Sequence, residues 1–587
     1  MGEAGRSRPS WRAALAVAGL LVTSVAGCVS MPSGGPVLSY TVTQGAGSQG
    51  QHYLQIIPEP PGPGWGPVDI VKGFLAASAS FVGQQKVARE YLTPSANSRW
   101  KPSWSATVFG GYGPNVAQAP GGTSGQRALV TVSGQAQASL SASGSYAFPS
   151  GTQGQPRFTF DLVKYGGQWR IAAPLPSQLL LTSVEFQADY QLRNLYFFDP
   201  GGNVLVPDPV YVPLQATPTN LVSGLVKDLI QPPGDWLSAA TKSAFPEGTA
   251  LAGNVTVDGG TASVNLTGSA VLHATKPELQ QISAQLLSTL SGSGQGQPLV
   301  QYIELSLNGK PWIPPGAPNG DPVQYASGYQ PAAGAYSTFY YLDAHGALWS
   351  QKGPPADPVK VAAPRAPSLS AIAVSPSGQY LAGLHDGNVY TGPLGGRLTR
   401  RASGGYTALS WDTGGGLWAA APSGVVLLRA DGGNPVQVQL LNSNGTQVPG
   451  TVTTLRVAPD GVRVALVIDG KWLRFGAISI QGQSHAAALN AVVTLSPFYV
   501  SGSGLTSVTW YGADDVIALS AFAPPTEYPV NGGTSVAIPS EPRMVSITAS
   551  SGNALVAGLA NGGMAANPST AGSWGLIGRG LAPVYPG

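Results

Sequence analysis

The chain has 587 residues, of which 10% are charged, and it contains 79 glycines and 52 prolines. Its length predicts three or four domains. Because turn-forming residues are so frequent and charges so few, we expect a β-rich protein rather than long charged helices. The formal net charge is only +3, and a nearly neutral chain lacks the clustered lysine and arginine that nucleic-acid binding requires. Nucleic acid is therefore excluded as a partner.

The first 28 residues have the pattern of a secretory signal. Three arginines precede an apolar run over residues 13–25, which is shorter than the roughly 20 residues that a membrane-spanning helix needs. Small residues then lead to Cys28, the only cysteine in the chain. Because no second cysteine exists, Cys28 is not part of an intrachain disulfide.

The predicted lipoprotein signal peptide, residues 1–27, ends in Val25-Ala26-Gly27 before Cys28, which resembles the lipobox of bacterial lipoproteins. The resemblance implies cleavage between Gly27 and Cys28, an S-diacylglycerol group on the Cys28 sulfur, and acylation (palmitate) of the new amino terminus. An ordinary secretory signal with a chance cysteine is the alternative. Because two or three acyl chains attach a protein stably to a bilayer, we expect a lipid anchor on the extracytoplasmic face of the cell membrane. Residues 28–57 are predicted to be the lipidated flexible tether.

Residues 58–183 are predicted to form an α+β domain. Apolar residues at helical spacing predict a helix over residues 70–82, a second short helix is expected over residues 86–92, and Thr93-Pro94 predicts that the helical part ends there. Strands follow, and Tyr165-Gly-Gly-Gln168 predicts a hairpin turn between two of them. Helices followed by a curved antiparallel sheet resemble the NTF2-like fold. That fold often carries a pocket, but no convergent His, Asp or Glu predicts catalysis here.

Residues 184–312 are predicted to form a second α+β domain. Two strands lead to a helix that opens at Thr217-Pro218, where the missing N–H of proline costs nothing. A tight hairpin turns at Asp258-Gly-Gly, and Thr275 with Glu278 predicts a capping box for a second helix. This order resembles the GerMN domain of sporulation and spore-germination proteins, and the shared phrases include Phe245-Pro-Glu-Gly-Thr249 and Ala262-Ser-Val-Asn-Leu266. The resemblance implies a non-enzymatic domain associated with envelope assembly and protein contacts.

The last part of the chain is repetitive. A Pro/Gly linker over residues 313–334 precedes it, and residues 335–587 contain repeated units of strand, polar Gly turn and strand. Such a repeat predicts an all-β propeller of about five or six blades, because one blade cannot bury both sheet faces without its neighbours. We expect the GerMN-like domain to dock against the propeller, with the more mobile joint near the lipidated tether.

No constellation in the sequence predicts catalysis, cofactor binding or a metal site. The five histidines are scattered without metal-ligand spacing, and the serine motif G-x-S-x-G is absent. We therefore predict that the protein is not an enzyme. Two alternatives stay open: an envelope glycan-acting hydrolase with paired carboxylates in the propeller funnel, and a propeller that binds a small ligand. Several aspartates lie beside glycines, where their side chains favour turns: Asp258, Asp386, Asp412, Asp460 and Asp514.

Lipobox, NTF2-like domain, GerMN domain and C-terminal propeller follow one another in an order that resembles the LpqB family of actinobacterial lipoproteins, over essentially the whole chain. The resemblance implies an accessory of the two-component system MtrA–MtrB that binds the extracellular domain of the sensor histidine kinase MtrB. It also implies a role in envelope homeostasis and cell division. The partner follows from the resemblance alone, because no residue pattern identifies a kinase-binding face.

Overall fold

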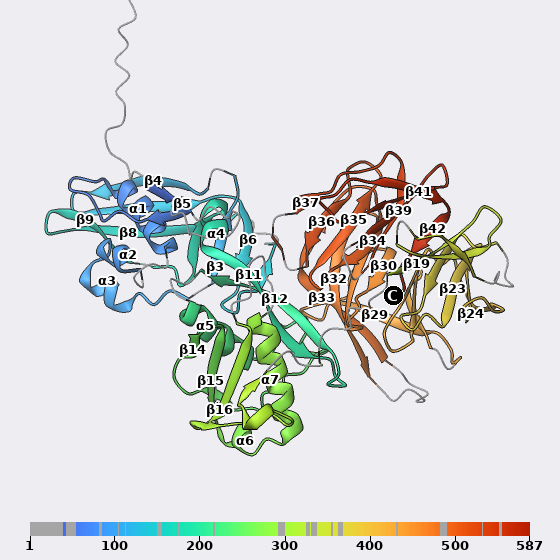
Figure 1. Cartoon of the computed structure of the whole chain (residues 1–587). Helices are drawn as coiled ribbons and strands as arrows, with labels where there is room; N and C mark the ends of the chain where they lie inside the picture. Colours follow the sequence, from blue (N-terminus) through green and yellow to red (C-terminus); the bar gives the residue numbers. More distant parts are fainter. Residues whose placement is uncertain are drawn as a thin grey trace, which may run out of the picture.

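The structure of the protein is a computed structural model in which three domains surround a two-stranded ribbon (Figure 1). The N-terminal domain lies on one side of this ribbon and the propeller on the other, while the middle domain extends away below them. The structure describes residues 39–42 and 54–587, apart from gaps at residues 81–84, 104, 112, 149–154, 174, 215–217, 292–299, 325–328, 330–336, 354–355, 362–367, 430–431, 482–489, 531, 534 and 551–553.

Two short strands lie inside the segment predicted as a flexible tether. β1 (Ser39–Val42) and β2 (Leu54–Ile57) pair antiparallel, from Ser39 opposite Ile57 to Val42 opposite Leu54. Both strands are rich in the β-branched and aromatic residues that favour extended backbone. Eight positions of the predicted tether therefore have paired, extended backbone, which the sequence analysis did not predict.

Three helices open the N-terminal domain: α1 (Pro67–Ala79), α2 (Lys86–Glu90) and α3 (Pro94–Arg99). The first two lie where the sequence predicted helices. The predicted stop at Thr93-Pro94 holds for α2, which ends at Glu90, but a third helix that the sequence analysis did not predict begins there, and Thr93 caps it. Its Oγ1 accepts a hydrogen bond from the backbone N of Ala96 at 3.2 Å, and proline suits the first helical position.

The strands of the N-terminal domain form two four-stranded sheets, in the orders β4-β5-β8-β9 and β10-β3-β6-β7. The predicted hairpin joins β8 to β9, with φ of +59° at Gly166 and +80° at Gly167. β10 pairs parallel with β3, a pairing that the sequence did not predict. The strands are β3 (Ala106–Phe109), β4 (Asn115–Ser124), β5 (Arg127–Ser133), β6 (Ala136–Leu140), β7 (Tyr146–Ala147), β8 (Arg157–Tyr165), β9 (Gln168–Ala173) and β10 (Leu179–Thr182).

A short helix leads from the N-terminal domain into the ribbon. α4 (Ser183–Asp189) begins at the predicted domain boundary, and Thr182 with Glu185 forms its capping box. The backbone N of Thr182 donates to Glu185 Oε2 at 2.7 Å, and the backbone N of Glu185 donates to Thr182 Oγ1 at 3.2 Å. The ribbon consists of β11 (Tyr190–Phe198) and β12 (Leu205–Pro213), which pair antiparallel along their whole length.

The body of the middle domain packs two helices, α5 and α7, on a small sheet of order β13-β15-β16-β17, with β14 and β18 alongside. The predicted capping box of α7 is confirmed, since the backbone N of Thr275 donates to Glu278 Oε2 at 2.7 Å. The elements are α5 (Pro218–Ile230), β13 (Ala250–Leu251), β14 (Thr256–Asp258), β15 (Thr261–Thr267), α6 (Ser269–Leu272), α7 (Lys276–Ser291), β16 (Tyr302–Leu307) and β17 (Lys310–Pro311).

The predicted linker over residues 313–334 contains regular structure in its first part. A 3-10 turn, η3 (Pro318–Gly320), leads to the short strand β18 (Val323–Gln324). Because β18 pairs antiparallel with β16, this part of the linker extends the sheet of the middle domain.

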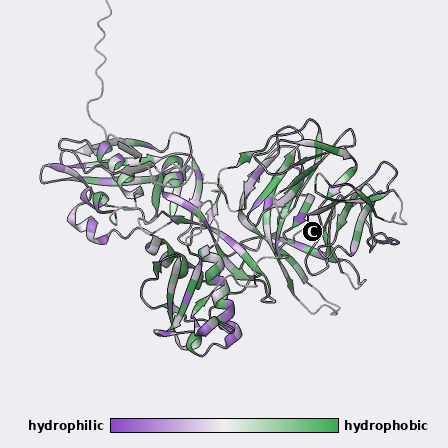
Figure 2. Ribbon diagram, viewed as in Figure 1, coloured by the Kyte–Doolittle hydropathy of each residue, from purple (hydrophilic) through white to green (hydrophobic). Residues whose placement is uncertain are grey.

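The C-terminal region is a propeller of six blades, the upper end of the predicted range. Four blades are separate four-stranded sheets, and the third and fourth blades share one eight-stranded sheet because β29 pairs parallel with β33. The final strand, β42 (Leu581–Val584), pairs antiparallel with β19 of the first blade and closes the ring. Figure 2 shows hydrophobic residues running along the strands of the blades.

Each repeat unit that the sequence predicted supplies the first two strands of one blade. Blade one has β19 (Thr338–Leu342), β20 (Leu348–Lys352) and β21 (Val359–Lys360), and blade two has β22 (Ala371–Val374), β23 (Tyr380–His385), β24 (Asn388–Pro393) and β25 (Thr399–Ser403). Blade three has β26 (Ala408–Trp411), β27 (Leu417–Ala421), β28 (Gly424–Leu428) and β29 (Val436–Asn442), and blade four has β30 (Val452–Val457), β31 (Arg463–Ile468), β32 (Trp472–Gln481) and β33 (Asn490–Ser501). Blade five has β34 (Leu505–Tyr511), β35 (Asp515–Ser520), β36 (Thr526–Pro529) and β37 (Val536–Ala537), and blade six has β38 (Met544–Ala549), β39 (Leu555–Leu559), β40 (Gly563–Asn567) and β41 (Gly575–Arg579).

Candidate functional site

The ribbon contributes to two different cores. Leu195 and Phe197 are buried in the core of the middle domain, together with residues of α5 and α7. Tyr190 and Tyr211 belong to a second core, which we call the junction core. Because successive side chains of a strand point to opposite faces, a single ribbon serves both cores.

The junction core contains buried side chains from all three domains. Leu181 comes from the N-terminal domain, Trp236 from the middle domain, Phe475 from blade four and Val516 from blade five. Each of these side chains is at most 2% exposed. The burial of this apolar surface favours the assembled arrangement. The predicted docking of the GerMN-like region against the propeller is thus confirmed for the ribbon and for the segment around Trp236.

Aromatic side chains join the N-terminal domain to the ribbon and to the propeller. The ring centroids of Tyr146 and Tyr211 are 5.6 Å apart, and those of Phe148 and Tyr499 of blade four are 5.4 Å apart. Blade five approaches the same group through Gly532, where an added Cβ would lie 2.6 Å from Cδ1 of Tyr146. With φ of +86°, this position suits glycine on both counts.

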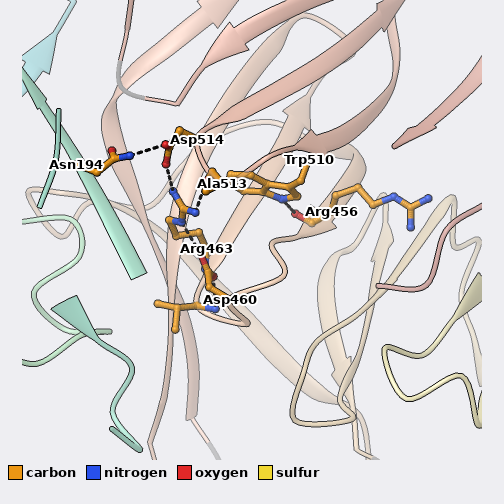
Figure 3. Close-up of polar contacts among 8 residues, drawn as sticks. Asn194, Arg456, Asp460, Arg463, Trp510, Ala513 and Asp514 are labelled. Carbon is orange, nitrogen blue, oxygen red and sulfur yellow. Dashed lines mark hydrogen bonds and ion pairs between the residues drawn. The ribbon is translucent and has the colours of Figure 1, made fainter. Parts of the chain in front are cut away.

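A polar cluster lies beside the junction core, on the turn between the first two strands of blade four (Figure 3). Asp460 Oδ1 accepts hydrogen bonds from the backbone N of Val462 and of Arg463, both at 2.8 Å. Asp460 Oδ2 accepts a third from Arg463 Nε at 2.6 Å. Both side chains are only 2% exposed. The aspartate therefore holds the turn, as the sequence predicted, and also pairs with a buried guanidinium.

The guanidinium of Arg463 also extends from blade four to blade five. Its Nη2 donates to the carbonyl O of Ala513, and its Cζ lies 5.0 Å from the centroid of the Trp510 ring. Its Nη1 lies 3.9 Å from Asp514 Oδ1, close enough for attraction but too far for a hydrogen bond. Arg463 thus links the equivalent turns of two neighbouring blades.

The ribbon reaches this cluster through Asn194 of β11. Its Nδ2 donates to Asp514 Oδ2, a hydrogen bond between residues 320 positions apart in the sequence (Figure 3). Among the residues that the structure describes, three buried atoms of the contact have no hydrogen-bond partner: Asn194 Oδ1, Asp514 Oδ1 and Arg463 Nη1. Buried polar atoms without partners are costly. The polar part of the docking contact is therefore incompletely satisfied, in contrast to its apolar part.

Carboxyl groups around Arg463 titrate at unusually high pH. Burial raises the pKa of Asp514, against the opposing field of Arg463. Burial, with the nearby charges of Asp514 and Glu527, raises the pKa of Asp515 to about 7. On β12, burial raises the pKa of Asp208 to about 6, although the backbone N of Gly234 donates to its Oδ2 at 2.8 Å. One guanidinium thus faces more carboxyl groups than it can neutralise.

The inner strands of the six blades surround the centre of the propeller. These six strands, β22, β26, β30, β34, β38 and β42, contain no aspartate or glutamate, and Arg456 is their one charged residue. Arg456 Nη1 donates to the carbonyl O of Leu409 at 3.3 Å and lies 3.5 Å from Gly587 O. Burial lowers its pKa to about 10. The inner strands therefore supply no carboxylate pair for the glycan-hydrolase alternative.

The sequence-predicted lipidation site, Cys28, and the cleavage point after Gly27 lie outside the described residues. Within the described ranges, no group of three or more His, Cys, Asp or Glu side chains is arranged to hold a metal ion. None of the helices in the described part of the chain combines the length and apolar character needed to cross a bilayer. His273 and His385 each bond a nearby backbone carbonyl, that of Ser269 and of Ser368 respectively.

Sequence reasoning missed the polar cluster although two signals were present. Arg463 stands at the start of a strand whose residues are all buried, and a charge in such a strand requires a partner. Asp514 is followed by a second aspartate, and adjacent carboxylates at the edge of a buried strand rarely serve only a turn. The contact with Asn194 had no local signal, because the two residues come from different domains.

Family models match three consecutive parts of the chain. The model described as "Lipoprotein LpqB, N-terminal domain" matches residues 60–187, the model described as "Sporulation and spore germination" matches residues 194–312, and the model described as "Lipoprotein LpqB beta-propeller domain" matches residues 346–586. Among solved structures, the Cps50 (Swd1) β-propeller domain of Myceliophteria thermophila aligns with a TM-score of 0.30 at 14% identity, covering 38% of this chain and 90% of that one.

Several relatives carry the name Lipoprotein LpqB. The protein of Thermobifida fusca is 30% identical, and the alignment covers 97% of each chain. That of Streptomyces coelicolor is also 30% identical, over 87% of this chain and 86% of its own, and that of Mycobacterium tuberculosis is 27% identical over 96% and 97%. Because the alignments span all three domains in the same order, the chain belongs to the LpqB family of lipoproteins.

Proposed function

We propose that this protein is a lipid-anchored accessory on the extracytoplasmic face of the cell membrane, and that it binds the extracellular domain of the sensor kinase MtrB without catalysing a reaction. Its relation to LpqB lipoproteins over 97% of the chain carries the proposal, together with Cys28 directly after Val25-Ala26-Gly27. The kinase as partner rests on the family resemblance. Through this contact the protein would modulate signalling in envelope homeostasis and cell division.

The arrangement of the domains supports a binding role. The junction core joins the N-terminal domain, the ribbon and two blades into one body with a dry apolar centre. Such a body presents fixed surfaces to a partner, which reduces the entropy lost on binding. The inner strands of the propeller carry no carboxylate, so the residues that a funnel hydrolase would use are missing from these strands.

The anchor is tested with the variant Cys28→Ala and a fatty-acid probe in cells. The variant should lose all acyl labelling and remain uncleaved, because the lipoprotein peptidase acts on the lipidated precursor. Ser30→Ala, two residues away, is the matched control and should label normally. Persistent labelling of Cys28→Ala would place the anchor elsewhere.

The partner is tested by co-purification from solubilised membranes with the wild-type lipoprotein as bait. MtrB should be enriched over an unrelated sensor kinase, and the purified MtrB extracellular domain should bind the purified lipoprotein directly. Absence of both contacts would contradict the kinase proposal. Release of sugars from envelope glycans by the purified protein would contradict the non-catalytic part.

A further inference from the structure

The docking contact between the ribbon and the propeller contains an excess of carboxyl groups in a poorly solvated place. Asp460 and Arg463 are 2% exposed, and the Asp514 side chain is 21% exposed. Four aspartates from the ribbon and two blades are under the influence of Arg463: Asp208, Asp460, Asp514 and Asp515. In the described part of this cluster, Arg463 is the only cation that acts on these groups.

The surroundings of Asp514 disfavour its ionised form on balance, because burial and a like charge outweigh the effects of Arg463 and of one hydrogen bond. Asp460 of blade four adds a like charge, and Asp515 of the same turn titrates under the influence of Asp514. On the ribbon, Tyr196 feels the charge of Asp514, which together with burial raises the pKa of its phenol. Asn194 contributes one hydrogen bond to the ionised form. One amide and one distant guanidinium do not replace the water that an exposed carboxylate would have.

A proton on Asp514 would add a hydrogen-bond donor to the contact between the ribbon and the propeller. Asp514 Oδ1 and Asn194 Oδ1 are both acceptors, both buried, and both without a donor. A protonated carboxyl group gains an O–H donor. The unpartnered donor of the contact, Arg463 Nη1, lies 3.9 Å from Asp514 Oδ1, which is too far for a hydrogen bond. Protonation of Asp514 therefore adds a donor between the ribbon and the propeller and removes the charge that this place poorly solvates.

We propose that docking of the ribbon on the propeller is a proton-coupled latch, which closes as the carboxyl groups around Arg463 take up protons and loosens as they ionise. The latch consists of Asn194 and Asp208 on the ribbon and of Asp460, Arg463, Asp514 and Asp515 on the propeller. The apolar junction core holds the domains near each other in both states. What changes is how firmly β11 and β12 are fixed to blades four and five.

The sign follows from linkage. Undocking would return to water Asp208 of the ribbon and Asp514, which Asn194 contacts, and an aspartate in water titrates near pH 4. Since burial raises their pKa in the docked state, the docked state binds more protons, and docking strengthens as the pH falls. Docking is strongest below about pH 4 and weakens as the pH rises through about 6 to 7, where Asp208 and Asp515 ionise in the docked state. The latch is independent of which partner the protein binds.

The test is amide hydrogen exchange of the purified full-length chain between pH 5.5 and pH 8.5, corrected for the intrinsic exchange rate at each pH. Peptides covering the ribbon, residues 190–213, should exchange about tenfold faster at the higher pH, since each proton taken up changes the docking equilibrium by up to about tenfold per pH unit. Peptides of β23 in blade two should change little, because this strand packs in cores that contain no residue of the ribbon.

The double variant Asp514→Asn with Asp515→Asn keeps the shapes and removes both charges. Its ribbon should stay protected at pH 8.5 to the level that the wild type shows at pH 5.5. Asp386→Asn is the matched control, since its side chain is 83% exposed in another turn of the propeller, and it should behave as the wild type. Peptides of β31 report whether blade four remains folded in each variant. A pH-independent ribbon in the wild type, or an unchanged pH dependence in the double variant with β31 intact, would overturn the proposal.

Discussion

Turns at equivalent places in blades three and four use an aspartate in different ways. In blade three, Asp412 accepts hydrogen bonds from the backbone N of Gly416 at 2.7 Å and from Trp418 Nε1 at 2.8 Å. Both carboxylate oxygens are thus satisfied within the turn. In blade four, the guanidinium of Arg463 takes the role of the indole on Asp460.

The two turns differ in how many N–H groups the donor still has after it bonds the aspartate. An indole has one N–H, whereas a guanidinium has five. After bonding Asp460, Arg463 still reaches Ala513 and approaches Asp514, which holds the ribbon through Asn194. The aspartate of the blade-three turn is therefore bonded only within its own blade, while the blade-four turn also contacts blade five and, through it, the ribbon. Variants of these two turns separate the two roles.

Arg463→Met is expected to have the largest effect. It leaves Asp460 and Asp514 without their cation in a poorly solvated place, which costs about 3–5 kcal/mol. The unfolding free energy of the propeller, measured by denaturant titration, should fall by that amount, and the ribbon should lose hydrogen-exchange protection as well. A variant that unfolds like the wild type would show that the cluster is solvated well enough to need no cation.

Trp418→Phe should have a smaller effect, limited to one blade. The aromatic ring stays, but Asp412 Oδ2 loses the indole N–H that it accepts, and a buried acceptor without a donor costs about 1–3 kcal/mol. Stability of the propeller should decrease while exchange at residues 190–213 stays at the wild-type level. Loss of ribbon protection in this variant would mean that the two turns are not independent.

Local signals in the sequence were sufficient for many elements. The hairpin at Gly166 and Gly167 and the capping box of Thr275 and Glu278 were predictable, because each depends on a few adjacent residues. The propeller was predictable because its repeat unit recurs in all six blades. The blade count was less certain, since the spacing of the repeat units varies along the chain.

Other elements depend on distant partners or on competing local signals. α3 was missed because proline serves equally well to stop a helix and to start one, and the choice depends on the hydrogen bond to Thr93. β18 was missed because two residues of strand carry no periodicity, and its existence depends on the edge of β16. The candidate site was the hardest feature to predict from the sequence, since Asn194 and Asp514 are brought together only by the docking of domains.

The variant Asn194→Ala tests the contribution of the ribbon to the contact. It removes the hydrogen bond to Asp514 but leaves Arg463 on Asp460. The cost to docking should be about 1 kcal/mol, the typical net contribution of one hydrogen bond. Hydrogen exchange of the ribbon should become several-fold faster with no change in the unfolding of the propeller. A change in propeller unfolding would mean that Asn194 stabilises the blade itself.

The smallest expected effect is a difference in pH dependence. Hydrogen exchange at the turn of blade one and at the ribbon should respond to pH in opposite directions. In blade one, Asp343 is near the surface and accepts hydrogen bonds from Trp349 Nε1 at 3.0 Å and from the backbone N of Ala347 at 2.9 Å. These bonds favour the ionised form and lower the pKa of Asp343. Its contribution to stability is present above the ordinary aspartate pKa near 4 and is lost as the pH falls through the lowered value.

Burial raises the pKa of Asp514, so its contribution has the opposite sign, present at low pH and lost as the pH rises. Corrected exchange rates should therefore rise on acidification for the blade-one turn, residues 343–347, and fall for the ribbon, residues 190–213. Asp343→Asn should abolish the first response and leave the second. If both regions respond with the same sign, the surroundings of the two aspartates do not control their titration, and the distinction between a turn bonded only within its own blade and the docking turn fails.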